Sequence, residues 1–376
     1  MSDHRAPERP LRIAQMLESD GPGGAEVVML QLSEELRRKG HEVVHVGPAV
    51  GEGWLGERFR EAGFPSMTFR LTRPVDFRCL NELTETLRKA EVDVVHSHEF
   101  TMCVYGAAAA RRLGIPHVTT MHGSQTVMEK LRRRVALRWA FRHAKLVVAC
   151  SEATRVDVED RLGLKAGTVH AVRNGVPERP GRRAPIREEL GLSEDELLVV
   201  AVGNVVPRKG HLIMLRAFAR LEDEGLDVPW RVAVAGDKRD AVPDIEALIA
   251  ERGWGDRVHL LGARDDVPDL LAGADVFCMP SLWEGLPLAV LEAMFAGLPV
   301  VASRTSGIPE ALDSDRVGLL SPPGEEAPLA ENLGAVLRDP ELRRALGEAG
   351  RERALSEFTV SRMADRYLAS YRGERA

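Results

Sequence analysis

The sequence predicts an α/β protein made of two doubly wound domains, each built on a parallel sheet. Short runs rich in β-branched residues alternate with longer helical patterns along the chain, which is typical of βαβ units. The chain has 376 residues, more than one hydrophobic core usually organises. A stretch without periodicity near the middle separates two copies of this rhythm, so we expect one domain on each side of it.

In the first half, strands are expected where β-branched residues gather, and the first strand is followed by a helix that runs to about Lys39. Residues 174–185, NGVPERPGRRAP, then combine three prolines, two glycines and three arginines without periodicity, which is typical of a linker. The strands expected before this linker are 11–17, 41–47, 92–98, 116–123 and 145–151.

Beyond the linker the same rhythm restarts, which predicts a second doubly wound domain. We expect an N-terminal domain over 1–180, a C-terminal domain over 181–355, and a last helix within 356–376 that packs back on the N-terminal domain. Ligands of such sheets bind beyond the carboxyl ends of the strands, so two facing domains would form one deep cleft. The strands expected here are 197–203, 230–236, 257–262, 275–280 and 298–303.

Composition excludes several classes of protein. The 51 basic and 57 acidic residues leave a formal charge of −6, which argues against a general nucleic-acid binder. The four cysteines are scattered without a C-x-x-C pair, so we expect neither a disulfide framework nor a zinc site, and a reducing cytoplasm fits best. The N-terminus has no apolar signal region, and no uncharged apolar stretch reaches the ~18 residues that a spanning helix needs.

The segment ESDGPGGAEVVML, residues 18–30, places three glycines between an expected strand and an expected helix. The glycines can serve a tight turn, or they can let a phosphate or sugar approach bare N–H groups at the helix N-terminus. A dinucleotide fingerprint would need a small residue where Glu26 stands, and the strand HEVVHVG does not end in an acid. A nicotinamide dehydrogenase is therefore the least favoured interpretation.

An acid on an apolar helix is the most informative feature of the second half. In SLWEGLPLAVLEAMFAG, Glu292 is surrounded by apolar residues, and no basic residue lies within helical reach. A buried carboxylate needs a partner, either an ion pair from another element or a ligand with vicinal hydroxyls such as a ribose. Glu284 stands eight residues earlier, where it could reach the other end of the same ligand.

These paired acids lie in EGLPLAVLEAMFAGLPVV, which resembles the signature of glycosyltransferase family 4. That family consists of retaining enzymes with the GT-B fold, so the resemblance implies two Rossmann-like domains facing across a cleft. It covers nearly the whole chain, because further short motifs occur in the family's order. They are GGAE after the first strand, MHG in mid-domain, RNGV at the domain junction, PRKG after the first strand of the second domain, and SGIPEAL after the acids.

The resemblance also implies roles for single residues in transfer from a nucleotide sugar. Glu292 would bind the ribose hydroxyls, and Glu284 would bind the sugar hydroxyls. His122, in the MHG motif, would contact the sugar near its reacting carbon. The donor phosphates would meet backbone N–H groups at Gly285 and Leu286 and, when the cleft closes, at Gly23 and Gly24.

Positive charge for the departing nucleoside diphosphate is expected on the PRKG loop. Arg208 and Lys209 directly follow a strand and could act as preorganised cations, although two cations on a loop can also be merely solvated. Asn204 stands where the family commonly has arginine, whose bidentate donors asparagine lacks, and Arg208 is the candidate substitute. This departure leaves open a catalytically idle GT-B protein that binds nucleotide sugar, and a sugar-nucleotide epimerase is a further alternative.

Neither a metal nor an organic cofactor is expected, because a UDP- or GDP-sugar would be the substrate. The sequence Asp313 to Asp315 imitates a metal-binding D-x-D, but we interpret it as a turn. His96 and His98 alternate along a strand, and two such histidines do not make a metal site. His98 could line the acceptor side of the cleft or be a structural histidine.

The acceptor is expected to be a glycan, a lipid-linked molecule or a small molecule, as in polysaccharide biosynthesis. Residues 129–145, EKLRRRVALRWAFRHAK, place eight basic residues on one predicted helix with apolar ones. Such a helix can lie on an anionic membrane, here the inner surface, and give weak peripheral contact. The alternative, a surface helix with solvated arginines, is the favoured interpretation of the sequence.

Overall fold

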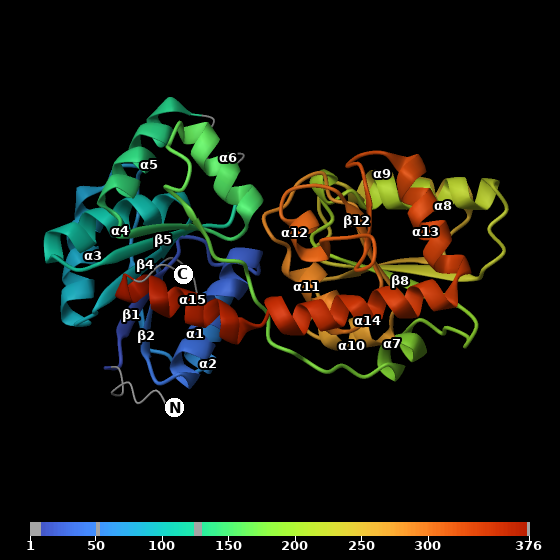
Figure 1. Ribbon diagram of the computed structural model, residues 1–376, viewed down its shortest axis with the longest axis horizontal. Coiled ribbons are helices and arrows are strands. Elements are labelled where there is room, and N and C mark those ends of the chain that lie inside the picture. The colour runs from blue at the N-terminus through green and yellow to red at the C-terminus, as the bar shows by residue number, and fades with distance from the viewer. Residues whose placement is uncertain (1–8, 50–52, 124–129, 374–376) are drawn as a thin grey trace, which may run out of the picture. The chain divides into compact units, whose positions relative to one another are not determined.

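A computed structural model describes residues 9–49, 53–123 and 130–373 of the chain. The chain divides into two compact units after Gly175 and again after Thr359, so that the second unit is Val176–Thr359 and the chain returns to the first unit at Val360 (Figure 1). The expected boundaries, 180/181 and 355/356, lie a few residues inside these limits. Within the second unit Val176 pairs with Thr359 in a parallel bridge, and Arg182 binds Asp269 at 2.8 Å.

The first unit contains a parallel sheet with the strand order β3-β2-β1-β4-β5-β6-β7. Its register places Gln15 of β1 beside His45 of β2 and His96 of β4. The strands are β1 (Arg12–Met16), β2 (Glu42–Pro48), β3 (Ser66–Phe69), β4 (Val94–His98), β5 (His117–Met121), β6 (Leu146–Ala149) and β7 (His170–Ala171). The helices are α1 (Gly24–Arg38), α2 (Trp54–Glu61), α3 (Phe77–Lys89), α4 (Glu99–Leu113), α5 (Leu131–His143), α6 (Glu152–Leu162) and α15 (Val360–Arg372).

The second unit repeats the architecture with the parallel order β10-β9-β8-β11-β12-β13. The strands are β8 (Leu197–Val202), β9 (Trp230–Ala235), β10 (Val258–Gly262), β11 (Val276–Met279), β12 (Val300–Ser303) and β13 (Leu319–Ser321). The helices are α7 (Ala184–Glu189), the 3₁₀ turn η1 (Pro207–Lys209), α8 (His211–Asp223), α9 (Val242–Arg252), α10 (Val267–Gly273), α11 (Leu288–Phe295), α12 (Ile308–Leu312), α13 (Glu326–Arg338) and α14 (Pro340–Glu357). Two doubly wound parallel sheets confirm the predicted fold class.

Helices cover these sheets through apolar cores. The central strands are buried, as in Val94–His98 and Val276–Met279, because parallel sheets carry helices on their faces. In the first unit α4 packs between α3 and α5, and α15, the last helix of the chain, packs beside α1 (Figure 1). No helix in the described ranges is both long and apolar enough to cross a membrane.

Candidate active site

In each unit the strand order reverses between two neighbouring strands, and the candidate residues follow those strands. In the first unit the reversal lies between β1 and β4, which lead to Gly23 and to His98. In the second it lies between β8 and β11, which lead to Lys209 and to Glu284. Ligands of open parallel sheets bind outside the carboxyl ends of the strands at such a reversal. Each unit therefore carries candidate residues at its own strand-order reversal.

Glu284 and the two PRKG cations form one electrostatic cluster in the second unit. Lys209 Nζ lies 2.6 Å from Glu284 Oε1, and an Arg208 guanidinium nitrogen lies 3.6 Å from the same oxygen. Ser281 Oγ donates a third contact to it at 2.8 Å. The Glu284 side chain is only 9% exposed, and that of Arg208 is 40% exposed. Lys209 is thus neutralised by Glu284, while Arg208 still presents charge to solvent.

The loops that carry these groups are joined to each other. Leu282 N donates to Arg208 O at 2.8 Å, and the Arg208 guanidinium lies 4.7 Å from the centre of the Trp283 ring. Gly210 has a φ of +70°, and a Cβ there would lie 2.0 Å from the carbonyl oxygen of Pro280. Only glycine permits this approach, so the sequence PRKG is required for the packing of the two loops as well as for charge.

Asn204 has a structural task in this unit. Its Oδ1 accepts a hydrogen bond from the backbone N–H of Asp237 at 3.2 Å, which links the ends of β8 and β9. Arginine has no acceptor atom and could not make this bond. The residue that departs from the family pattern is therefore integrated into the fold, and the nearest exposed guanidinium on the same loop is that of Arg208.

Glu292 lies on α11, as predicted, and the charge that acts on its carboxylate is that of Arg179. Burial raises its pKa above the usual value, and Arg179 acts weakly in the opposite direction. Across the described part of the chain, no hydrogen bond or ion pair engages this carboxylate. A structural ion pair, the alternative that the sequence left open, is not formed there. The group is available to accept two O–H donors from a ligand.

Gly285 and Leu286 precede the helix and are not part of it. Helix α11 begins at Leu288, with Pro287 as its N-cap. The carbonyl of Gly285 accepts from Gly307 N at 2.8 Å, and Leu286 is buried. The cause is proline, which restricts the residue before it to extended backbone. Any phosphate held by Gly285 and Leu286 would thus contact an ordered loop that leads into the helix.

In the first unit, the glycine loop already faces a carboxylate. Gly23 is the N-cap of α1, and a Cβ on it would lie 2.3 Å from Glu26 Oε2. At Gly21 and Gly24 a Cβ would meet nothing within 4 Å, so neither glycine is required by packing. Glu26 occupies the favourable place for negative charge in the first turn of α1. A phosphate at Gly23 would have to displace this carboxylate, whereas the space beside Gly24 is open.

Glu99 is a site residue that the sequence analysis missed. It follows β4, has a φ of +63°, which is unusual for a residue with a side chain, and accepts from His122 N at 3.0 Å. Burial raises the pKa of Glu99 to about 7, and the nearby charge of Glu26 adds to this effect. The sequence signal for Glu99 was its position directly after the expected strand VDVVHSH. Only the histidines of that strand, His96 and His98, were considered as candidates there.

His122 and His98 belong to one buried hydrogen-bonded chain. His98 Nδ1 lies 2.8 Å from His122 Nε2, and His98 Nε2 lies 2.8 Å from Gln15 Oε1. Gln15 Nε2 in turn lies 3.5 Å from the hydroxyl of Tyr371 on α15. Burial lowers the pKa of His122 to about 4 and that of His98 well below its usual value, so both rings are neutral at pH 7.

The direction of the hydrogen bonds in this chain follows from Gln15. A carbonyl oxygen only accepts, so His98 donates from Nε2 and accepts at Nδ1, and His122 donates from Nε2. The remaining nitrogen of His122, Nδ1, then carries a lone pair that can accept from a ligand hydroxyl. His98, which was considered for the acceptor side of the cleft, contacts His122 directly, the residue expected to contact the donor sugar.

His96 and Asp313, the other residues considered for a metal, have structural partners. His96 joins Tyr371 at 2.7 Å and Thr120 at 2.8 Å, which is a structural arrangement. Asp313 has a φ of +60°, lies at a turn after α12 and pairs with Arg353 at 3.1 Å. Among the residues that the structure describes, no cluster of three His, Cys, Asp or Glu side chains could hold a metal ion.

Comparisons with known proteins show the family to which the chain belongs. A family model described as Glycosyltransferase Family 4 matches residues 22–179, and one described as Glycosyl transferases group 1 matches residues 182–353. The alpha-maltose-1-phosphate synthase of Mycobacterium tuberculosis is 30% identical over 306 residues, which cover 74% of this chain and 78% of that protein. The 2-deoxystreptamine glucosyltransferase of Streptomyces kanamyceticus is 29% identical over 341 residues, 84% of this chain and 87% of that protein. The chain belongs to the family 4 glycosyltransferases.

A solved structure shows the same fold. Anabaena HepE in complex with UDP and glucose matches with a TM-score of 0.84 and 23% identity, covering 96% of this chain and 99% of that one. The predicted GT-B fold is thus confirmed, and so is the resemblance to family 4 that the motifs carried. The protein is a glycosyltransferase.

Proposed function

We propose that this glycosyltransferase moves a sugar from a nucleoside-diphosphate sugar, UDP- or GDP-linked, with retention of anomeric configuration. The observation that carries the proposal is the arrangement around α11. Glu292, whose carboxylate has no hydrogen bond or ion pair within the described residues, follows Glu284, a carboxylate clamped by two cations, on one loop and helix at the strand-order reversal. Vicinal ribose hydroxyls suit the first carboxylate, and a sugar hydroxyl beside phosphate-binding cations suits the second.

In the proposed reaction the bond between the sugar carbon and the β-phosphate oxygen breaks, and the acceptor oxygen bonds to that carbon on the same face. The acceptor proton passes to the departing phosphate, so no side chain is assigned as general base. Arg208 and Lys209 would stabilise the negative charge that grows on the phosphate, without a metal ion. His122 Nδ1 would accept from a sugar hydroxyl near the reacting carbon.

The acceptor is proposed to be a glycan, a lipid-linked molecule or a small molecule met in the cytoplasm. Relatives support this breadth, because one is named for glucosyl transfer to 2-deoxystreptamine and another for transfer to a diphosphoundecaprenol-linked sugar. The phosphate contacts at Gly24, Gly285 and Leu286 are part of the same proposal, and the position of Glu26 makes Gly23 the weakest of them.

Thermal denaturation with UDP, GDP and ADP tests the donor. A nucleotide present at 100 times its dissociation constant adds about 2.7 kcal/mol to the free energy of unfolding, which is easily measured. Release of nucleoside diphosphate from the matching sugar nucleotide then tests transfer, and EDTA should leave its rate unchanged. Binding without turnover would support the idle protein that Asn204 leaves open. Product formed without acceptor, with the nucleotide still attached, would support an epimerase.

A further inference from the structure

Helix α5 carries an apolar stripe on its outer side. Leu131, Val135 and Trp139 lie one turn apart and are 73%, 60% and 36% exposed. The same helix already buries Leu137 and Phe141 on its inner side. The sequence could not separate these two sets, because all five residues are apolar. A helix whose inner face is packed needs no outer stripe for folding, so the stripe requires another explanation.

Arginines share this outer side, and α5 has no acidic residue. Arg132, Arg138 and Arg142 are exposed on the same side as the stripe. In the described ranges none of these three takes part in an ion pair. The outer side therefore combines apolar and cationic groups without any negative charge. A purely solvated helix would gain nothing from its exposed Leu131 and Val135.

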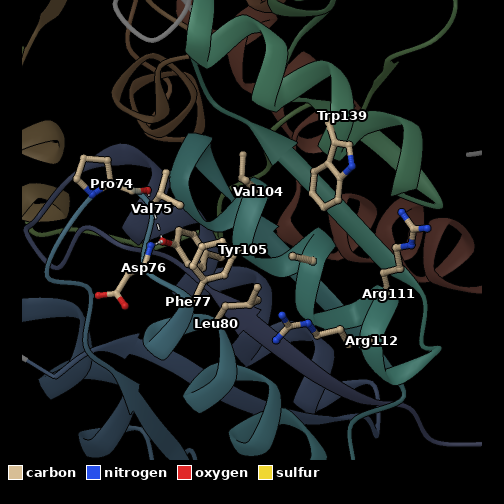
Figure 2. Close-up of a pocket in the computed structure, with 11 residues that line it drawn as sticks. Pro74, Val75, Asp76, Phe77, Leu80, Val104, Tyr105, Arg111, Arg112 and Trp139 are labelled. Carbon is tan, nitrogen blue, oxygen red and sulfur yellow. Dashed lines mark hydrogen bonds between the residues drawn. The ribbon is translucent and has the colours of Figure 1, made fainter.

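The stripe continues into a pocket between α3, α4 and α5, because Trp139 belongs to both (Figure 2). The pocket has a volume of about 530 Å³, within the range of small-molecule sites. Two guanidinium groups lie at its edge, and neither pairs with a carboxylate among the described residues: Arg111 lies 2.6 Å from His143 Nε2, and Arg112 donates to Asn81 at 2.8 Å. Its other walls are mainly apolar, formed by Pro74, Val75, Phe77, Leu80, Val104, Tyr105 and Ala108.

Hydrogen bonds hold the pocket wall in place, and no carboxylate of the described lining residues points toward Trp139. Its only acid is Asp76, whose carboxylate caps α3 by accepting from Arg78 N and Cys79 N and points away from Trp139 (Figure 2). The Tyr105 hydroxyl accepts from Asp76 N at 2.7 Å and holds the loop before α3 in place. Exposed Val75 on that loop and exposed Phe77 at the start of α3 extend the apolar surface.

We propose that this surface, the outer side of α5 with the adjoining pocket, docks on an anionic lipid bilayer. The arginines would bind lipid phosphates, Trp139 and Phe77 would lie at the level of the headgroups, and the pocket would receive part of one acyl chain. Tryptophan and arginine are favoured at this depth, and apolar area and basic charge together set the binding strength. This docking does not depend on the proposed transfer reaction.

The charges and apolar residues of this surface favour a lipid bilayer over a second copy of the chain and over a nucleic acid. A twofold contact with a second copy would bring the arginines of one α5 against those of the other, and α5 itself carries no acid to neutralise them. A nucleic acid would use the arginines, but it would leave aliphatic Leu131, Val135 and Val75 in contact with phosphate and water. An anionic bilayer satisfies the apolar and the cationic groups together.

Co-sedimentation of the full chain with vesicles tests the proposal. Vesicles of phosphatidylcholine with phosphatidylglycerol should bind the protein, high salt should weaken binding, and phosphatidylcholine alone should bind much less. Arg138→Ala with Arg142→Ala should reduce partitioning about 30-fold, from about 1 kcal/mol per arginine. Trp139→Ala should reduce it about ten-fold, and lipids brominated in the acyl chain should quench fluorescence in the native chain more than in Trp139→Phe.

Matched controls lie in the second unit. Leu355→Ala removes a similarly exposed apolar side chain, and Arg316→Ala removes an exposed arginine, and both should bind vesicles like the native chain. Equal losses in controls and α5 variants, or no preference for anionic vesicles, would overturn the proposal. The proposal would also be overturned if the protein did not bind vesicles but bound oligonucleotides tightly or dimerised through Trp139. Thermal shifts by nucleoside diphosphates, measured on the same variants, report separately on the transfer function.

Discussion

Three carboxyl groups of the candidate site are set apart by their immediate surroundings. Glu284 is held by Lys209 and Arg208, whereas Glu292 is half-buried on an apolar helix and has its pKa raised. Glu99 is half-buried near Glu26, and desolvation raises its pKa to about 7. The same carboxyl group thus has three different properties. Glu284 is ion-paired, Glu292 can accept hydrogen bonds from a ligand, and Glu99 is about half protonated at physiological pH.

The first two carboxylates should separate in binding assays. Glu292→Ala should weaken binding of free nucleoside diphosphate, because it removes the acceptor for the ribose hydroxyls. Glu284→Ala should leave that affinity nearly unchanged but lower turnover and discrimination between sugars. Calorimetry with the free nucleotide and kinetics with several donor sugars check this. Equal losses of free-nucleotide affinity in the two variants would contradict the assignment.

Glu99 predicts a pH-dependent stability difference. Its pKa is about 7 when folded and near 4.5 otherwise, so the folded chain holds a proton that the unfolded chain releases between these values. Its contribution to stability is therefore present below pH 4.5 and is lost as pH rises through 7. Glu99→Gln keeps the acceptor for His122 N–H and does not titrate. In urea unfolding, the free energy of unfolding of the variant minus that of the native chain should rise by roughly 1–3 kcal/mol between pH 5 and pH 8. A difference that does not vary with pH would contradict this.

Among the elements, the two loops after β8 and β11 act as one positioning device. Their backbone contact between Leu282 and Arg208, and the close packing of Gly210 on Pro280, place the cations beside Glu284. The electrostatics of the site thus depend on a glycine that has no functional group.

Gly210→Ala tests this dependence, with Gly253→Ala as the control. Both glycines have nearly the same φ, +70° and +69°, but a Cβ at Gly253 would meet nothing within 4 Å. The control should lose about 1–2 kcal/mol of stability, the cost of the left-handed backbone alone. Gly210→Ala should lose more than that and also lower turnover, because the loop must move. Urea unfolding and donor kinetics measure both, and equal stability losses would show that the loop contact carries no weight.

Over the full length of the chain, the return of α15 to the first unit links the C-terminus to the candidate site. Tyr371 contacts His96 and Gln15, and Gln15 leads through His98 to His122. Tyr367, on the same helix, contacts Thr120 at the opposite end of this network. The last helix therefore completes the hydrogen bonds that orient His122.

Tyr371→Phe should alter the protonation pattern of His122, whereas Tyr367→Phe should not. Loss of the Tyr371 hydroxyl frees Gln15 to turn its amide, which would reverse the direction of donation to His98. Each variant should lose about 1 kcal/mol of stability, so folding alone does not distinguish them. Long-range ¹H–¹⁵N spectra of histidine-labelled protein, assigned with His122→Asn, should show Nε2–H in the native chain. Identical spectra in both variants would contradict the direction of donation assigned to the hydrogen bonds between Gln15, His98 and His122.

Much of the fold and part of the site could be predicted because they depend on local patterns. β-branched runs bounded by glycine and proline identified the inner strands, and the lone acid among apolar residues identified Glu292. The edge strands β3, β7 and β13 were not identified, because they are short and, in the case of Ser66–Phe69, partly exposed. Such strands lack a strong hydrophobic pattern.

The remaining features depend on contacts between distant parts of the chain. Gln15 meets Tyr371 across 356 positions, and Lys209 meets Glu284 across 75, so no spacing rule could pair them. The sequence likewise could not divide the apolar residues of α5 into inner and outer sets, because that division depends on where α4 packs. Local periodicity set the elements and their order, since it acts through backbone geometry and burial of one face. The partners of each titratable group were decided by packing, because charge, hydrogen bonding and burial act through space and not along the chain.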